Sequence, residues 1–403
     1  MSLFHLGERA YDHVLLLPPK SKAYGPALTP NILLDFINSD GNILLALSGD
    51  HPTPSGISSL LLEFDISIPS DRNALVVDHF NYDTKSAPEK HDVIVVSSPK
   101  QLRPDLRSFF ETKQELAVPR AVGHTLGNAN ALLVPILRAP STAYSYNPKD
   151  ESEGMEDLFA SGEQLALISA LQARNSARFT VLGSAEMLQN EWFGASVKIP
   201  GRKDAKTSNR EFAKQLSQWT FKELGVLKVQ SLHHHLNDGT VYSGNESSFP
   251  LSELDPKIYR IKNDVTYTIE VSEYIEDHWA PFTPPGTDVL QLEFSMLSPF
   301  HRLPLSPISS TQNSTVYSVS FKLPDQHGIF NFRVNYKRPF LTTVDEKRQV
   351  TVRHFAHDEW PRSWEISGAW VWIAGIGVTA VGWVAFVAIW LWSRPEDEIK
   401  KTQ

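Results

Sequence analysis

The sequence contains no cysteine among its 403 residues. Disulfide bonds, thiolate nucleophiles and cysteine-ligated metal ions are therefore excluded, because each of these requires a cysteine sulfur. Proteins without disulfide bonds are more often cytosolic than secreted. The membrane features described below outweigh that preference, since a large domain can be stable without disulfide bonds.

The sequence also lacks an excess of basic residues. It has 38 Lys and Arg against 46 Asp and Glu, which gives a formal net charge of -8. Proteins that bind nucleic acids neutralise phosphates with basic surfaces, so this function class is disfavoured. Hydrophobic residues make up 41% of the chain, which is enough for packed cores. The length predicts two or three domains.

A charge-free segment from Ile366 to Ser393 stands out near the C-terminus. Its apolar part has about 25 residues, which as a helix would cross a hydrocarbon core of roughly 30 Å with some tilt. Indole rings favour the headgroup region of a membrane. Tryptophans lie near both ends of the segment, at Trp364, Trp370, Trp372, Trp390 and Trp392. The sequence therefore predicts one transmembrane helix at residues 366–392.

Four small residues in this segment are candidates for packing against a partner helix, because small side chains let two helices approach closely. They are Gly375, Gly377, Thr379 and Gly382.

The tail at residues 393–403 carries Lys400 and Lys401, the fourth and third residues from its end. Lysines at these positions resemble the dilysine retrieval signal of endoplasmic-reticulum membrane proteins, which a cytosolic receptor reads. The tail is therefore predicted to be cytosolic, and the bulk of the chain to lie in the lumen as a single-pass type I protein.

A luminal location makes two Asn-X-Ser/Thr sequons, at Asn245 and Asn313, candidate N-glycosylation sites. It also requires a signal peptide. The segment Met1–Tyr11 contains Glu8 and Arg9 and has no apolar run, so it does not resemble one. We interpret this as an N-terminal truncation.

Residues 1–230 predict an α/β domain. Asp12–Leu17 and Asn42–Leu47 are typical of buried strands, and Thr29-Pro30 is typical of a helix start, with threonine as cap and proline at the first position. Further apolar runs alternate with helical patterns up to Glu211–Leu224, which Gly225 is expected to end. This alternation predicts a mostly parallel sheet in a three-layer fold.

The pattern changes after residue 230. We predict a linker at residues 231–265, followed by an antiparallel β-sandwich at residues 266–362. Short alternating segments such as Tyr267–Val271 and Val316–Phe321, separated by Pro and Gly turns, support the sandwich.

No set of residues predicts a catalytic site, a metal site or a cofactor site. Ser184 lies at a strand-to-helix turn but outside a G-x-S-x-G frame, so it is favoured as a helix cap over a nucleophile. His233, His234 and His235 would point to alternating faces of a strand and cannot share one tetrahedral ion without strain, so a surface linker is favoured. Asp78, His79 and Asp83 are favoured as the end of a buried strand over an acid–base group. The acidic residues at 150–157 and the basic residues at 198–210 are favoured as solvated loops.

Several segments together resemble the family of the 48-kilodalton subunit of oligosaccharyltransferase, known in fungi as the wheat-germ-agglutinin-binding subunit. These segments are LQARNSAR at 171–178, FKELGVL at 221–227, VDHFNYD at 77–83, STAYSY at 141–146, YSVSFKLPD at 317–325 and GIF at 328–330. The dilysine end is also typical of this family, and the resemblance extends over essentially the whole chain.

The resemblance implies a non-catalytic type I subunit of the complex that transfers a preassembled oligosaccharide from dolichyl diphosphate to asparagine in Asn-X-Ser/Thr. Its expected partners are a ribophorin-II-like subunit, a small subunit resembling the defender against cell death, and a catalytic polytopic subunit that holds the metal. The family fold is a degenerate flavodoxin- or amidotransferase-like α/β domain, of which the first strand and helix are missing here. Two other hypotheses remain open, a luminal hydrolase using Ser184 or an Asp–His pair, and a receptor for glycans or cargo.

Overall fold

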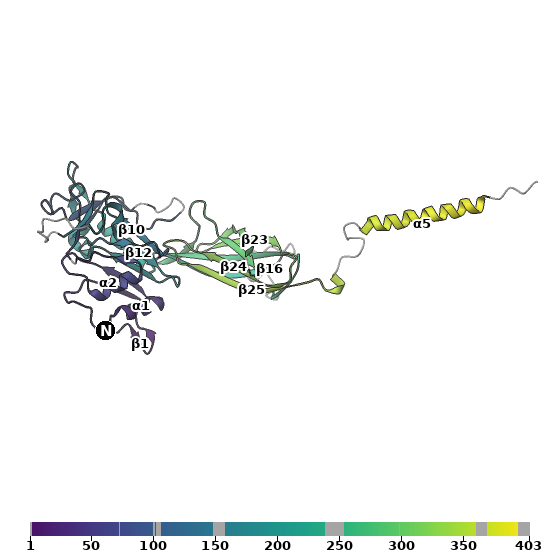
Figure 1. The fold of residues 1–403 in the computed structure, drawn as a ribbon, viewed down its shortest axis with the longest axis horizontal. Helices are drawn as coiled ribbons and strands as arrows, with labels where there is room; N and C mark the ends of the chain where they lie inside the picture. Colours follow the sequence, from purple (N-terminus) through teal and green to yellow (C-terminus); the bar gives the residue numbers. More distant parts are fainter. Residues whose placement is uncertain are drawn as a thin grey trace, which may run out of the picture.

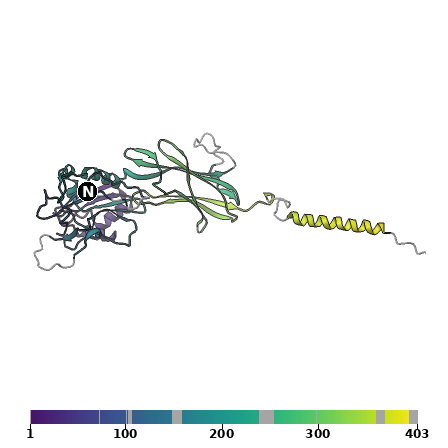
Figure 2. The same ribbon diagram turned by 90° about the horizontal axis from the view of Figure 1, so that it is seen from above.

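The computed structural model describes residues 2–71, 73–99, 101, 106–147, 158–237, 254–297, 299–359 and 369–393. Along the long axis of the molecule, an N-terminal domain with helices and strands is followed by an elongated β-domain and then by helix α5 (Figure 1). A view from above shows the same order of the three parts (Figure 2).

The largest sheet of the N-terminal domain is mixed, with strand order β10-β12-β13-β4-β3. Strands β3 (His13–Leu16), β4 (Asn42–Ala46) and β13 (Arg178–Leu182) are parallel. Strands β12 (Ala166–Gln172) and β10 (Leu133–Arg138) run antiparallel to their neighbours. The prediction of a mostly parallel sheet is therefore wrong for the half of the sheet that contains β10 and β12. The chain passes from β12 to β13 through only residues 173–177, and so short a connection can join only antiparallel strands.

Helices cover both faces of this sheet. Helices α1 (Pro30–Asn38) and α2 (Ser55–Glu63) share a core with Ile43 and Leu45 of β4. Helix α4 (Asn209–Thr220) shares another core with Leu44 and Ala46 of the same strand. Successive side chains of a strand point to opposite faces, so the fully buried β4 contributes to both cores.

The start of α1 is as predicted, because Thr29 Oγ1 accepts a hydrogen bond from the Ile32 N–H at 3.5 Å. The helix ends at Asn38, two residues before a left-handed residue. Asp40, not Gly41, adopts the left-handed conformation with φ of 70°. Gly41 is needed for space instead, since a Cβ there would lie 2.3 Å from the ring of Phe36.

Five two-stranded sheets complete the N-terminal domain. They pair β1 (Phe4–His5) with β2 (Glu8–Arg9), β5 (Ile66–Ser67) with β9 (Thr125–Leu126), β6 (Leu75–Val77) with β11 (Tyr144–Tyr146), β7 (Val93–Val96) with β8 (Leu116–Pro119), and β14 (Ser196–Val197) with β15 (Ala205–Lys206). Three short helical segments are η1 (Gly162–Gln164), η2 (Ala185–Leu188) and α3 (Asn190–Phe193).

The β-domain consists of two five-stranded sheets. One contains β16 (Leu224–Leu236), β18 (Asp264–Ile275), β23 (Thr315–Lys322), β22 (Ser306–Ser310) and β19 (His278–Pro281). The other contains β17 (Ile258–Arg260), β25 (Val344–Arg353), β24 (Gly328–Tyr336), β20 (Gln291–Ser295) and β21 (Pro299–Pro304). Side chains of both sheets share one core, in which the rings of Tyr267 and Phe332 stack with centroids 5.5 Å apart.

The predicted linker at 231–265 is wrong where the structure has strands. Strand β16 starts at Leu224 and carries the three histidines, and β17 and the start of β18 also lie within the predicted linker. The three consecutive histidines at 233–235 are polar, so the sequence predicted a surface segment there. In the structure, however, His234 and His235 are buried. His234 lies against Phe332, 4.9 Å between ring centroids, and bonds to the hydroxyl of Tyr259 at 2.7 Å. Strand β17 pairs in parallel with β25, so the sandwich is not purely antiparallel.

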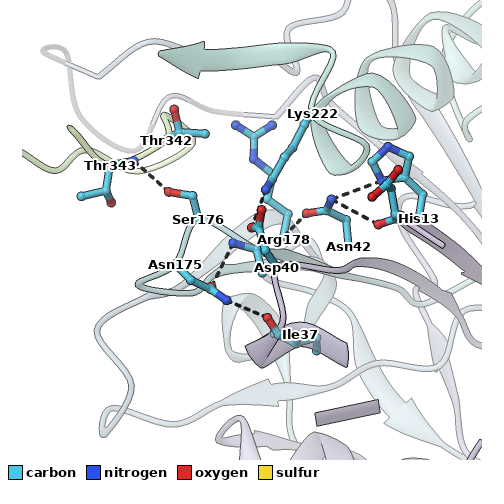
Figure 3. Close-up of polar contacts among 12 residues, drawn as sticks. His13, Ile37, Asp40, Asn42, Asn175, Ser176, Arg178, Lys222, Thr342 and Thr343 are labelled. Carbon is cyan, nitrogen blue, oxygen red and sulfur yellow. Dashed lines mark hydrogen bonds and ion pairs between the residues drawn. The ribbon is translucent and has the colours of Figure 1, made fainter. Parts of the chain in front are cut away.

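A buried arginine joins the two domains (Figure 3). Arg178 of β13 is fully buried, and its guanidinium donates to the main-chain carbonyls of Trp219, Leu224 and Gly225. The guanidinium also lies 4.7 Å from the centroid of the Trp219 ring. Arg178 thus links the central sheet to the end of α4 and to the first residues of β16.

Polar contacts around Arg178 extend this junction (Figure 3). The Arg178 N–H donates to Asn42 Oδ1 at 3.0 Å, and Lys222 pairs with Asp40 at 2.6 Å. From the β-domain, the Thr343 N–H donates to Ser176 Oγ at 3.1 Å. The contact between Thr343 and Ser176 holds the β12–β13 turn against the β-domain.

Replacing Arg178 by Met is expected to lower the free energy of unfolding by about 3 kcal/mol or more, because three buried carbonyls lose their donor. Thermal unfolding of the full chain in detergent checks this. Arg174, exposed four residues earlier, is the matched control. Arg174→Met should change the free energy by no more than about 0.5 kcal/mol. Equal melting temperatures for the two variants would contradict the role given to Arg178.

Candidate functional site

Ser184 follows β13 at the N-cap position of η2, as its sequence context predicts, but its side chain makes no capping hydrogen bond. Its hydroxyl donates to the carbonyl of Pro119 instead, and the residue is 1% exposed. A nucleophile needs a base as hydrogen-bond partner and access to substrate. Ser184 has neither among the described residues, which speaks against the hydrolase hypothesis.

Asp78 and Asp83 lie in the loop after β6, as expected for the end of a buried strand. Both are buried. Asp78 accepts hydrogen bonds from the main chain of Phe80 and Asn81 and from the Thr142 hydroxyl. Asp83 accepts from the main chain of Lys198 and from Ser86. Both carboxylates therefore hold the loop in shape and are not free for acid–base chemistry.

The histidines at 233–235 do not converge on a common point. His233 bonds to Asp255 at 2.9 Å, His234 to Tyr259, and His235 to the carbonyl of Leu236 at 2.9 Å. Burial lowers the pKa of His234 to about 4, so its ring is neutral at pH 7. Among the described residues, no group of three or more His, Asp or Glu side chains is arranged to hold a metal ion.

A buried Ser–His pair was not predicted from the sequence. His124 Nε2 lies 2.7 Å from Ser169 Oγ of β12, and both residues are 0% exposed. Burial lowers the pKa of His124 to about 4. The two residues are 45 positions apart in unrelated segments, so no local sequence pattern marks them. Without access to solvent, the pair contributes to the core and does not form a substrate site.

The basic residues at 198–210 are all exposed. One of them has an acidic partner, and an acidic residue of the same segment pairs with a lysine outside it. Arg202 pairs with Glu115 at 2.9 Å, and Asp204 within the segment pairs with Lys85 at 2.6 Å. The exposure agrees with the predicted solvated segment, but the loop does not extend over all of it, because Lys206 lies in β15 and Arg210 in α4. The acidic residues at 150–157 lie outside the described residues.

Of the predicted modification and targeting sites, the structure describes one. Asn313 is exposed in the turn between β22 and β23, and its N–H donates to Thr311 Oγ1 at 3.3 Å. Asn245, Lys400 and Lys401 lie outside the described residues.

Helix α5 (Ala369–Trp392) carries no charged residue, is the one described helix long and apolar enough to cross a membrane, and buries no side chain in this chain. It ends where the predicted span ends. At about 100° per residue, Thr379 and Gly382 lie within about 40° of Gly375 on one face, whereas Gly377 lies about 160° away. The four candidate residues therefore do not share one face, because a spacing of two residues changes the face of a helix.

Trp372 and Trp383 border the face that carries Gly375 and Thr379, and the side chains leave a shallow groove between them. We call Gly375, Thr379 and Gly382 the small-residue stripe. The Thr379 hydroxyl donates to the Gly375 carbonyl at 2.9 Å, so it needs no acceptor from a neighbouring helix. The stripe is a surface suited to close helix contact.

Comparison with protein families gives two matches that together span most of the chain. The model of the OST48 N-terminal domain matches residues 1–223, and the model of the OST48 middle domain matches residues 237–394. The first match ends directly before β16, close to the structural boundary between the domains.

Curated relatives align along nearly the whole chain. The dolichyl-diphosphooligosaccharide–protein glycosyltransferase subunit wbp1 of Schizosaccharomyces pombe is 33% identical over 98% of this chain and 84% of its own length. The subunit WBP1 of Saccharomyces cerevisiae is 32% identical over 96% of this chain and 80% of its own length. The 48 kDa subunit of Caenorhabditis elegans is 31% identical over 98% of this chain and 83% of its own length.

Proposed function

The chain belongs to the OST48 family, and from this membership we propose that it acts as a non-catalytic subunit of oligosaccharyltransferase. This complex transfers a preassembled oligosaccharide from dolichyl diphosphate to asparagine in Asn-X-Ser/Thr. The alignment with subunits of that name over 98% of the chain carries the proposal.

The described residues support a non-catalytic role. Ser184 is buried with a main-chain partner, Asp78 and Asp83 are used by their own loop, and the pair of His124 and Ser169 is closed to solvent. We assign the N-terminal domain a three-layer, amidotransferase-like fold, which the packing of α1 and α2 on one face and α4 on the other supports. Catalysis and the divalent metal then belong to a polytopic subunit. A ribophorin-II-like subunit and a small subunit resembling the defender against cell death complete the proposed contacts.

The proposed function can be tested by depleting the protein from cells that normally express it. Occupancy of sequons should fall on many unrelated secretory glycoproteins, because the complex acts on a short tripeptide and not on one folded substrate. Mass spectrometry of glycopeptides measures the occupancy, and re-expression of the chain is the control. Native purification through a tag on the tail should recover the proposed subunits. Unchanged occupancy after complete depletion would reject the proposal.

For the location we propose a single-pass type I protein of the endoplasmic-reticulum membrane. Helix α5 is the anchor, residues 1–365 are luminal, and the tail at 393–403 is cytosolic, with Lys400 and Lys401 as its retrieval signal. The exposed position of Asn313 is compatible with a glycan, and the charge-free length of α5 is compatible with a single crossing.

This topology predicts that Asn313 and Asn245 receive glycans, because both lie on the luminal side. In intact microsomes the luminal part should resist protease, whereas a tag after residue 403 should be removed. Endoglycosidase should increase the gel mobility of the chain, and Asn313→Gln should abolish one step of that change. A protected C-terminal tag would show the opposite orientation.

The small-residue stripe of α5 is the proposed contact for a helix of another subunit. Lipid chains are as apolar as the helix itself, so packing of small residues selects the partner and burial of apolar surface does not. The stripe lies on one face, and the large indole rings of Trp372 and Trp383 border a shallow groove that contains Gly375 and Thr379.

Gly375→Leu should reduce recovery of partner subunits about tenfold, corresponding to a loss of about 1.4 kcal/mol in helix contact. Gly377→Leu is the matched control, since it makes the same change on the opposite face. A Cβ at either glycine meets no atom of this chain within 4 Å, so neither change strains the chain itself. Quantitative mass spectrometry after purification in mild detergent measures recovery. Equal recovery for the two variants would exclude the stripe as a contact.

A further inference from the structure

A groove of about 610 Å³ lies where the two domains meet. Two strands of different sheets line it, β16 at residues 227–229 and β25 at residues 344–346. The β12–β13 turn at residues 174–176 also lines it, and there Ser176 accepts the hydrogen bond from the Thr343 N–H (Figure 3). Both domains therefore contribute to one site, which we call the junction groove.

Strand β16 presents an open main-chain edge to this groove. Among the described strands, β18 is its one neighbour in the sheet. The main chain of Leu227 points away from β18, since its N–H and carbonyl bond to the Thr342 hydroxyl at 2.6 and 3.3 Å. The pairing with β18 is regular from Leu227 to Val229. Because main-chain direction alternates along a strand, Val229 also directs its N–H and carbonyl away from β18.

The first part of β25 has an open edge as well. Strand β17 pairs with β25 only at residues 351–353, so the preceding residues of β25 pair with β24 alone. The Thr351 N–H points away from β24, since it donates to the Lys257 carbonyl at 2.9 Å. Asp345 lies an even number of residues earlier in a ladder without register shifts. Its N–H and carbonyl therefore point to the same open side.

Open strand edges select one conformation of partner. Their N–H and carbonyl groups form hydrogen bonds with an extended polypeptide that adds to the sheet. A helix cannot replace such a segment, because its main-chain groups are already bonded within the helix. Since Val229 and Asp345 both line the junction groove, this site suits an extended segment of polypeptide.

The junction groove also carries an excess of positive charge, although the chain has a formal net charge of -8. Of the two acidic residues that line it, Asp345 accepts two hydrogen bonds from Arg333, both of 2.8 Å. Its charge is thus neutralised, and Glu346 is left to offset three cations. These cations are exposed and form no salt bridge with a described carboxylate; they are Arg174, Lys228 and Lys337.

This charge decides which extended segment fits. Lysines beside an open strand edge commonly keep two copies of a protein from pairing there, because like charges repel. A second copy of this chain is disfavoured for the same reason. An acidic segment is attracted instead, and its carboxylates can form charge-assisted hydrogen bonds with the three cations.

We propose that the junction groove binds an extended acidic segment of another subunit, which pairs its main chain with an open edge and its carboxylates with the three cations. The inference rests on the proposed function, since it assumes membership of a complex. It deepens that function by stating where and by which chemistry this chain holds a partner in addition to the contact through α5.

The first test measures binding of a labelled peptide of alternating Glu and Val to the full chain in detergent, by fluorescence anisotropy. Arg174→Glu, Lys228→Glu and Lys337→Glu together should weaken binding about tenfold or more, because three attractions become repulsions. The matched control reverses three exposed lysines of the same two domains outside the groove, Lys113, Lys214 and Lys322, with the same change in net charge. Equal affinities of the two triple variants would overturn the inference.

Modified peptides test the main-chain pairing without changing the protein. N-methylation of every second residue removes the donors along one edge of the peptide and keeps all carboxylates. Two peptides, methylated on the two alternate sets of residues, cover both edges. At least one should bind about tenfold more weakly than the unmethylated peptide, because it cannot pair with a strand edge. Equal binding of all three would show attraction of charge alone and overturn strand addition.

Cross-linking within the purified complex separates this inference from the proposed function. A photoreactive p-benzoylphenylalanine in place of Lys228 should cross-link to an acidic segment of another subunit. A cross-link to a second copy of this chain, or to a segment without acidic residues, overturns the inference and leaves the subunit role intact. Failure of the unmodified chain to recover any other subunit would contradict the proposed function instead.

Discussion

The arrangement of the two domains that precede helix α5 depends on one buried charge. Arg178 is removed from water, and burial lowers the pKa of its guanidinium. Three carbonyls and the face of Trp219 replace the lost hydration. These acceptors belong to the end of α4 and the start of β16, which are the segments that leave the N-terminal domain. A buried charge without hydrogen-bond partners is costly. Separating the two domains would remove carbonyl partners from the Arg178 guanidinium, so this cost opposes their separation.

A junction held in this way suits the proposed non-catalytic role. The polar groups that could have performed chemistry are occupied by the fold, as Asp78 and Ser184 illustrate. Among the described residues, the small-residue stripe on α5 is a surface that remains available. A subunit that positions other components requires its domains to keep a fixed arrangement. The buried Arg178 contributes to this by holding the N-terminal domain to the start of the β-domain.

Local rules predicted some elements well and missed those that tertiary contacts decide. The Thr29 cap, the uniformly apolar β4 and the charge-free α5 each follow from a few neighbouring residues. Strand β16 was missed because its histidines are polar, and only the far-removed Phe332 and Tyr259 make their burial favourable. The pair of His124 and Ser169 joins segments distant in sequence. Sequence spacing cannot reveal such sites, whereas Gly377 could have been assigned to the other face from helix geometry alone.

Contacts of both helix α5 and the preceding domains in the proposed complex would have an energetic consequence. A single helix with three small residues on one face gives only a modest contact free energy in lipid. If the two domains of the same chain also contact the complex, the helix docks at high effective concentration, and the two contacts reinforce each other without either being strong. This requires that the two domains keep one arrangement, since a flexible connection lowers the effective concentration. In the proposed complex, the junction at Arg178 would therefore contribute to the strength of assembly, although it lies far from helix α5 along the chain.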